Sequence, residues 1–116
     1  MKERLTRGAI VLTRFPFTDL SGTAVRPALV VSAGTIGQDV VLAGISSVLR
    51  GGTIATDLVV DSTHPEFRQT RLPVPLVMRL HKLATVELTV IVRRLGRIGR
   101  RLQDEVDRVL RTVIGV

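Results

Sequence analysis

One arginine stands where it would be well suited to bind phosphate. Residues 15–17 read Phe-Pro-Phe, a polar turn follows, and Arg26-Pro27 then leads into an apolar run. Because proline cannot donate to a strand ladder, Pro16 marks the end of one strand and Pro27 the start of the next, and the loop between them projects outward. Arg26 would be held stiffly at the exit of that loop, where a guanidinium group can recognise phosphate. The alternative is an ordinary solvated loop arginine.

The remaining candidates for chemistry are few. Phe17, in the same loop, could stack on an unpaired base, an interaction worth about 1–3 kcal/mol; a packing role is its alternative. His64 precedes Pro65 in an irregular stretch, and we expect it to be exposed to solvent. The chain has no cysteine, its two histidines are isolated, and no Asp/Glu cluster has ligand spacing. We therefore expect no metal site and no cofactor.

Short apolar runs predict a small α+β domain. Residues 8–32 predict a β-hairpin with strands at 9–12 and 28–31. At the end of the chain, residues 100–114 carry an apolar stripe at i, i+4, i+7, i+8 and i+11, which predicts an amphipathic helix. We expect a curved, partly closed antiparallel sheet, an SH3-like barrel, with this C-terminal helix. Between the hairpin and the helix, we expect strands at 40–47, 56–60, 76–80 and 90–98. We also expect an irregular stretch at 61–72 with at most one helical turn, and a brief helical turn at 81–85.

Composition limits the class of protein. A chain of 116 residues is expected to form one domain, residues 1–116. The net charge is +7, and 15 of the 17 basic residues are arginine, which indicates a polyanionic partner, either nucleic acid or an acidic protein. A high genomic GC content would give the same bias toward arginine. We expect no signal peptide, no membrane span and a reducing cytoplasmic location.

Four motifs, in order along nearly the whole chain, resemble the MazF/PemK family of toxin endoribonucleases. They are FPFTDLSGTAVRPALVVS at 15–32, AGISS at 43–47, LPVPLVMRLHKLATV at 72–86 and IVRRLGRIGRRLQDEV at 91–106. The resemblance implies a compact barrel-like fold and a homodimer with a basic groove for single-stranded RNA. It also implies an antitoxin whose acidic, disordered tail competes for that groove.

The same resemblance assigns catalysis to an arginine of the Arg-Pro motif and a hydroxyl residue at the end of the third strand, here Arg26 and Ser46. It implies a metal-independent, sequence-selective cleavage in which the RNA 2′-hydroxyl is the nucleophile, leaving a 2′,3′-cyclic phosphate and a 5′-hydroxyl. Because an arginine stays protonated at ordinary pH, Arg26 is expected first to stabilise charge on the phosphate and only second to carry protons. Side chains alternate in a strand, so only one of Ser46 and Ser47 should face the groove, and Ser46 is preferred.

Further residues are expected to bind substrate. His81 stands where the family usually has an acidic residue, in the pattern RLDKLAT, so a different base preference is one interpretation of this departure. Arg79 and Lys82 beside it are candidates for phosphate or base contacts, or are simply solvated. The full set of expected binding residues is Phe17, Thr18, Ser47, Arg79, His81 and Lys82.

Two other classes of protein remain as alternatives. The first is a non-catalytic toxin of the same fold that binds DNA gyrase, as CcdB does. Such proteins characteristically end in Trp-Gly-Ile, whereas this chain ends in Ile114-Gly115-Val116 and has no tryptophan. The second is an inactive RNA- or protein-binding module, against which the presence of Arg26 and Ser46 argues.

Overall fold

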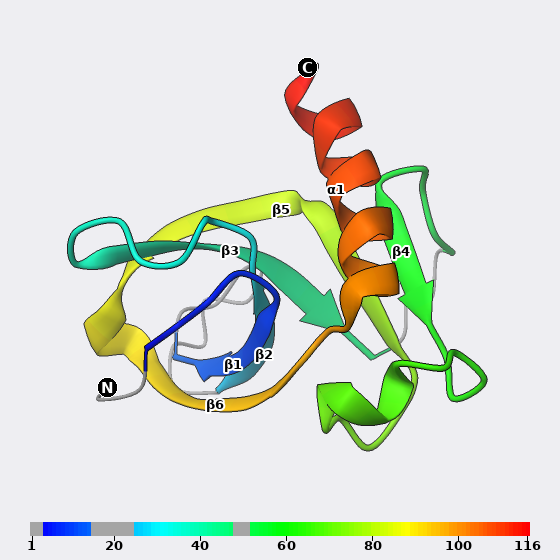
Figure 1. Ribbon diagram of the computed structural model, residues 1–116, viewed down its shortest axis with the longest axis horizontal. Coiled ribbons are helices and arrows are strands. Elements are labelled where there is room, and N and C mark those ends of the chain that lie inside the picture. Colours follow the sequence, from blue (N-terminus) through cyan, green and yellow to red (C-terminus); the bar gives the residue numbers. More distant parts are fainter. Residues whose placement is uncertain (1–3, 15–24, 48–51) are drawn as a thin grey trace.

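The computed structural model describes residues 4–14, 25–47 and 52–116. These residues form a single antiparallel sheet and a helix at the C-terminal end of the chain (Figure 1). No helix in this part of the chain is long and apolar enough to cross a membrane. The strands are β1 (Ala9–Thr13), β2 (Arg26–Val30), β3 (Asp39–Ser46), β4 (Asp57–Val60), β5 (Leu76–Glu87) and β6 (Ile91–Arg97), accompanied by 3-10 turns η1 (Phe67–Thr70) and η2 (Leu88–Val90) and helix α1 (Arg100–Ile114).

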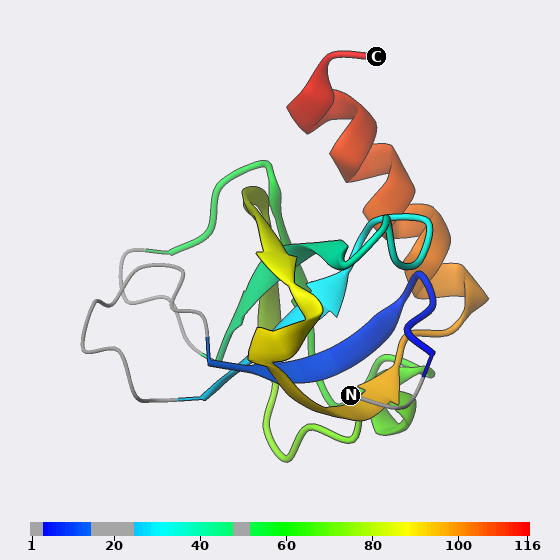
Figure 2. The same cartoon turned by 90° about the vertical axis from the view of Figure 1, so that its left-hand side faces the viewer.

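The six described strands follow the order β4-β5-β3-β2-β1-β6. The sheet is strongly curved, as Figures 1 and 2 show, but it is not closed, because β4 and β6 both remain edges. The predicted α+β fold with a curved sheet and a C-terminal helix is confirmed. So is the pairing of the predicted hairpin, since β1 and β2 are antiparallel from Ile10↔Leu29 to Thr13↔Arg26.

The helical turn predicted at residues 81–85 is wrong, because these residues continue strand β5. Leu83 pairs with Ala43 of β3, whereas Arg79 pairs with the next residue, Gly44, so that residues 80–82 bulge out of the ladder. A bulge bends its strand and breaks the alternation of side chains. The mixed polarity of this stretch therefore reflects the bulge, and the bend lets the first third of β5 pair with both β3 and β4.

The two faces of the sheet bury separate apolar clusters. One cluster lies under α1, where Leu102, Val106 and Leu110 of the predicted stripe pack against residues such as Leu29 and Met78. The other fills the inside of the curl and includes Val11, Ala28, Val30, Val40, Leu42, Val86 and Ile91. Residues of β2 and β3 contribute alternately to the two, as strand alternation requires.

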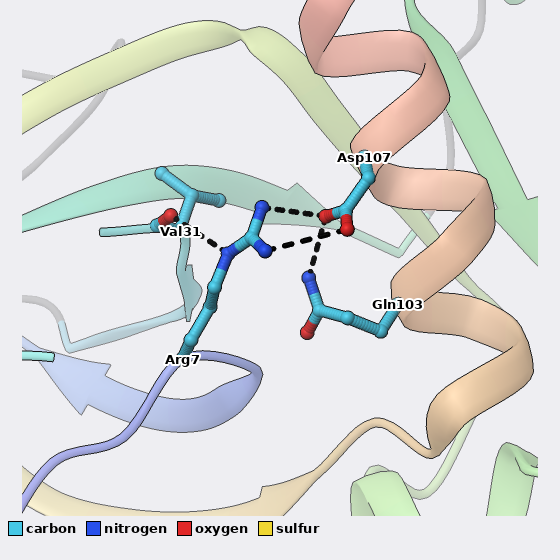
Figure 3. A network of polar contacts seen from close by, with 4 residues as sticks. All are labelled: Arg7, Val31, Gln103 and Asp107. Atoms are coloured by element: carbon cyan, nitrogen blue, oxygen red, sulfur yellow. Dashed lines mark hydrogen bonds and ion pairs between the residues drawn. The ribbon is translucent and has the colours of Figure 1, made fainter. Parts of the chain in front are cut away.

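Polar contacts made by Arg7 and Glu66 hold α1 against the rest of the fold. Figure 3 shows Arg7, which precedes β1, with its guanidinium on Asp107 of α1 at 2.5 Å and its Nε on the carbonyl oxygen of Val31 at 3.3 Å. Gln103 donates to the same carboxylate at 2.8 Å. At the start of α1, the carboxylate of Glu66 accepts the backbone N–H groups of residues 101 and 102 at 3.0 and 2.8 Å. Glu66 thus serves as the N-terminal cap that α1 itself lacks.

Candidate active site

The register of the sheet sets Arg26 and Ser46 on the same face. Arg26 begins β2 and pairs with Thr13 of β1, while Ala28 pairs with Gly44 of β3. The ladder ends at this pair, and continuing its register by two residues along both strands would bring Arg26 level with Ser46, the last residue of β3. Residues level with one another on neighbouring strands point to the same side of a sheet. Arg26 is exposed and Ser46 is half-buried, so both are accessible to a ligand on this face.

A largely apolar pocket of about 320 Å³ opens beside Ser46. Among the described residues the ladder between β2 and β3 stops at Ala28↔Gly44, so the end of β3 is not covered by β2. Residues 71–76 form the opposite wall, and Arg71 brings a positive charge to it. The sequence predicts that only one of Ser46 and Ser47 faces the groove. Both line this pocket, because Ser47 lies just beyond the strand, where alternation no longer separates them.

Arg79 lies on the same face, one row further along the sheet. It pairs with Gly44 on one side and with Asp57 of β4 on the other. As a diagonal neighbour of Ser46, it starts about 7–8 Å away, which a long side chain can span. Its Nε donates to Oδ1 of Asp57 at 3.1 Å, and the Asp57 side chain is 0% exposed against 23% for Arg79. A buried carboxylate therefore orients Arg79, and the structure collects Arg26, Ser46 and Arg79 on one face.

The other predicted binding residues are placed differently. His81 and Lys82 lie in the bulge of β5 and are half-buried. His81 Nδ1 is 2.9 Å from Oγ1 of Thr56, the residue before β4, so its imidazole is held at the β4 side of the sheet. Phe17 and Thr18 lie outside the described residues.

Comparison with known protein families shows to which family the chain belongs. Residues 6–114 match the family described as the PemK-like, MazF-like toxins of type II toxin–antitoxin systems. The chain belongs to this family. No protein of curated function matches it significantly.

Solved structures similar to this MazF-like chain share its fold over nearly their whole length. The Mycobacterium tuberculosis toxin MazF-mt6 superposes with a TM-score of 0.71 at 17% identity, over 93% of this chain and 97% of that one. MazF (Form-I) from Deinococcus radiodurans gives 0.74 at 16% identity, over 99% and 100%. An endoribonuclease in complex with its cognate antitoxin, from a mycobacterial species, gives 0.71 at 20% identity, over 97% and 96%.

Sequence reasoning missed a group of arginines that this MazF-like fold brings together. We call Arg68, Arg71, Arg93, Arg94 and Arg97 the arginine cluster. They come from the end of η1 and from β6, and they line two adjoining cavities. Residues 93–97 follow an obvious basic pattern, but nothing local indicates that η1 packs beside them.

His64 is not the exposed loop residue that the sequence predicts. Its side chain is only 16% exposed; Nδ1 accepts the backbone N–H of Glu66 at 3.0 Å, and Nε2 lies 3.4 Å from Oε2 of Glu105. An imidazole whose Nδ1 accepts carries its proton on Nε2. His64 therefore joins residues 61–66 to α1. No group of three His, Asp or Glu residues in the described segments is arranged to hold a metal ion.

Proposed function

We propose that this MazF-like chain is a metal-independent, sequence-selective endoribonuclease that cleaves single-stranded RNA. The observation that supports the proposal is the register of β2 and β3, which, continued by two residues, would set Arg26 level with Ser46 on one face of the sheet. Membership of a toxin family, and structural similarity to proteins described as endoribonucleases, support the same activity.

In the proposed reaction the nucleophile comes with the substrate. The 2′-oxygen of the RNA attacks the adjacent phosphorus and loses its proton, while the bond from phosphorus to the 5′-oxygen breaks and that oxygen takes up a proton. The products are a 2′,3′-cyclic phosphate and a 5′-hydroxyl. The protein must hold the attacking hydroxyl in line with the leaving oxygen and stabilise the charge that grows on the phosphate oxygens.

Each side chain on the face has a task suited to its chemistry. The guanidinium of Arg26 stays positive at ordinary pH, so it offsets the charge on the non-bridging oxygens. The Ser46 hydroxyl donates a hydrogen bond to the same phosphate. Arg79, already oriented by Asp57, contacts a neighbouring phosphate as a pre-positioned cation. The remaining proposed contacts to RNA are made by Phe17, Thr18, Ser47, His81 and Lys82.

We also propose a cytoplasmic homodimer that an antitoxin inhibits. A net charge of +7 favours an acidic, disordered antitoxin tail that competes with RNA. A small domain with exposed apolar side chains such as Ile36, Ile114 and Val116 gains burial by pairing about a two-fold axis. Light scattering should give twice the chain mass; a mass near 12.7 kDa for fully active protein would contradict the dimer.

The activity is tested by incubating purified protein with a mixed RNA pool in EDTA and sequencing the new 5′-hydroxyl ends. We expect cuts at a common short sequence, with 2′,3′-cyclic phosphate on the upstream fragments. No cleavage in EDTA, with cleavage restored by a divalent cation, would refute the proposed chemistry.

A further inference from the structure

The arginine cluster concentrates positive charge at one edge of the sheet. A cavity of about 690 Å³ is lined by Arg71, Arg93, Arg94 and Arg97 together with residues 69, 95 and 96. A second cavity of about 470 Å³, lined by residues 68, 69 and 71, adjoins it. Neither lining contains an acidic residue among the described segments.

Other arginines of the chain show what internal neutralisation looks like. Arg7 is paired with Asp107, and Arg79 with Asp57. By contrast, no ion pair within the described segments involves Arg71, Arg93 or Arg97. Like charges brought this close repel unless anions lie between them. Arg71, Arg93 and Arg97 are therefore suited to an anionic ligand.

The backbone holds the cluster in place. β6 bulges against β1 on both sides of Arg93 and Arg94, since register shifts fall between Ile10 and Val11 and between Leu12 and Thr13. Bulges re-aim the side chains beside them. η1 packs directly on Gly96, where an added Cβ would lie 2.5 Å from the carbonyl oxygens of residues 69 and 70; Figure 1 shows this green turn beside the end of β6.

Arg71 occupies an unusual conformation at the junction. It follows η1 with φ 60° and ψ 20°, in the left-handed region. Among the described residues, Arg71 is the one residue other than glycine that has a positive φ. Residues with a side chain seldom adopt this region, and such outliers concentrate at functional sites. Arg71 also lines both the cluster's cavities and the pocket that contains Ser46. It thus connects the cluster to the candidate active site.

We infer that the arginine cluster binds backbone phosphates of the RNA strand on one side of the cleaved bond, with Arg71 as the link. This inference rests on the proposed function and deepens it. The RNA strand leaves the pocket beside Ser46, passes Arg71 and continues over Arg93 and Arg97. The contacts are to phosphates, so they add affinity without reading bases. An acidic peptide is a less suitable ligand, because peptides of this kind also need apolar anchoring sites. Leu95 is the one large apolar residue among the described residues that line the larger cavity.

The test uses single-stranded DNA of about 20 nucleotides, long enough to exceed one small binding domain. It has the phosphates but no 2′-hydroxyl, so it is bound and not cut. The variants are Arg71→Gly, which removes the cation and suits the left-handed backbone, and Arg93→Ala/Arg97→Ala. The matched control is Arg108→Ala, an exposed arginine of α1 outside the cluster. For each protein, Kd is measured against salt, and RNA cleavage is measured at saturating substrate.

We expect the slope of log K against log salt to fall by about 0.7 for each cluster arginine removed, and the control to keep the wild-type slope. KM for RNA should rise for both cluster variants and stay at the wild-type value for Arg108→Ala. If the cluster variants bind DNA with the slope and Kd of Arg108→Ala, the inference is wrong. The inference is also wrong if the cluster variants bind an acidic peptide more weakly but keep the wild-type affinity for single-stranded DNA. Absence of RNA cleavage by the wild-type protein would refute the proposed function alone, because the slopes are measured without cleavage.

Discussion

Asp57→Ala should destabilise the fold by about 2–4 kcal/mol, a large effect for one residue of an edge strand. The Asp57 side chain is fully buried, and its two oxygens have different partners: Oδ1 accepts from Arg79 at 3.1 Å and Oδ2 from the backbone N–H of Ile54 at 2.9 Å. Removing one partner of a buried ion pair costs about 3–5 kcal/mol. Arg79 keeps 23% exposure, so water screens the unpaired guanidinium and the cost falls below that upper end.

The assay is urea unfolding of Asp57→Ala, Arg79→Ala and the double variant. Because the two residues contact each other, the double variant should lose less stability than the sum of the single losses, by about 0.5–3 kcal/mol. Asp104→Ala, which removes an exposed carboxylate of α1, is the matched control and should change stability by less than about 0.5 kcal/mol. Additive losses, or a loss for Asp57→Ala no larger than the control's, would show that Asp57 does not orient Arg79.

Other predictions concern the supports of the site and its charge. Glu66→Ala should lower the free energy of unfolding in urea by about 1–2 kcal/mol, and Glu66→Gln by less, because the carboxylate caps α1 and glutamine keeps an acceptor oxygen; wild-type stability for Glu66→Gln would argue against a charge effect. Gly96→Ala should cost about 1–3 kcal/mol by forcing η1 away from β6, and should weaken binding of single-stranded DNA; wild-type behaviour in both would contradict the close packing. A hydrogen bond from the Thr63 side chain, followed by one from its backbone, lowers the pKa of Asp61. The stabilisation it gives is therefore present above the unfolded pKa and is lost as pH falls through the folded one, so Asp61→Asn should flatten the thermal stability profile below about pH 4. If three to five phosphates are bound, log K for RNA should fall by about 2 to 3.5 per decade of salt, whereas a flat profile would exclude a phosphate-based interface.

Much of the fold follows from local patterns. The apolar stripe predicts α1 to its observed bounds, since Leu102, Val106 and Leu110 are spaced for one helix face. Two apolar runs joined by a short polar loop predict the pairing of β1 with β2. The path of β5 could not be predicted in the same way, because the bulge at residues 80–82 removes the alternation from which a strand is recognised. What looks like a helical turn in sequence is a bend that the neighbouring strands impose.

The candidate site was likewise predictable only where local motifs indicate it. Arg26 and Ser46 were predicted from motifs, and the sheet register brings them level; their catalytic roles remain predictions. Contacts between distant segments were not predictable. The carboxylate of Glu66 caps a helix that begins 34 residues later, and the arginine cluster exists only because η1 packs on β6. Such arrangements depend on how separate elements pack together, and the sequence of each element alone does not indicate them.

In the proposed reaction, Arg26 and Ser46 stabilise attack by the RNA 2′-hydroxyl. The most direct test is the single-turnover cleavage rate, at saturating RNA and in EDTA, of Arg26→Ala and Ser46→Ala beside Arg108→Ala and Ser62→Ala, two exposed residues of the same types. Loss of one pre-positioned donor should slow each site variant by about 10²–10³, with unchanged thermal unfolding and unchanged controls. Cleavage by either site variant at the wild-type rate would contradict the account.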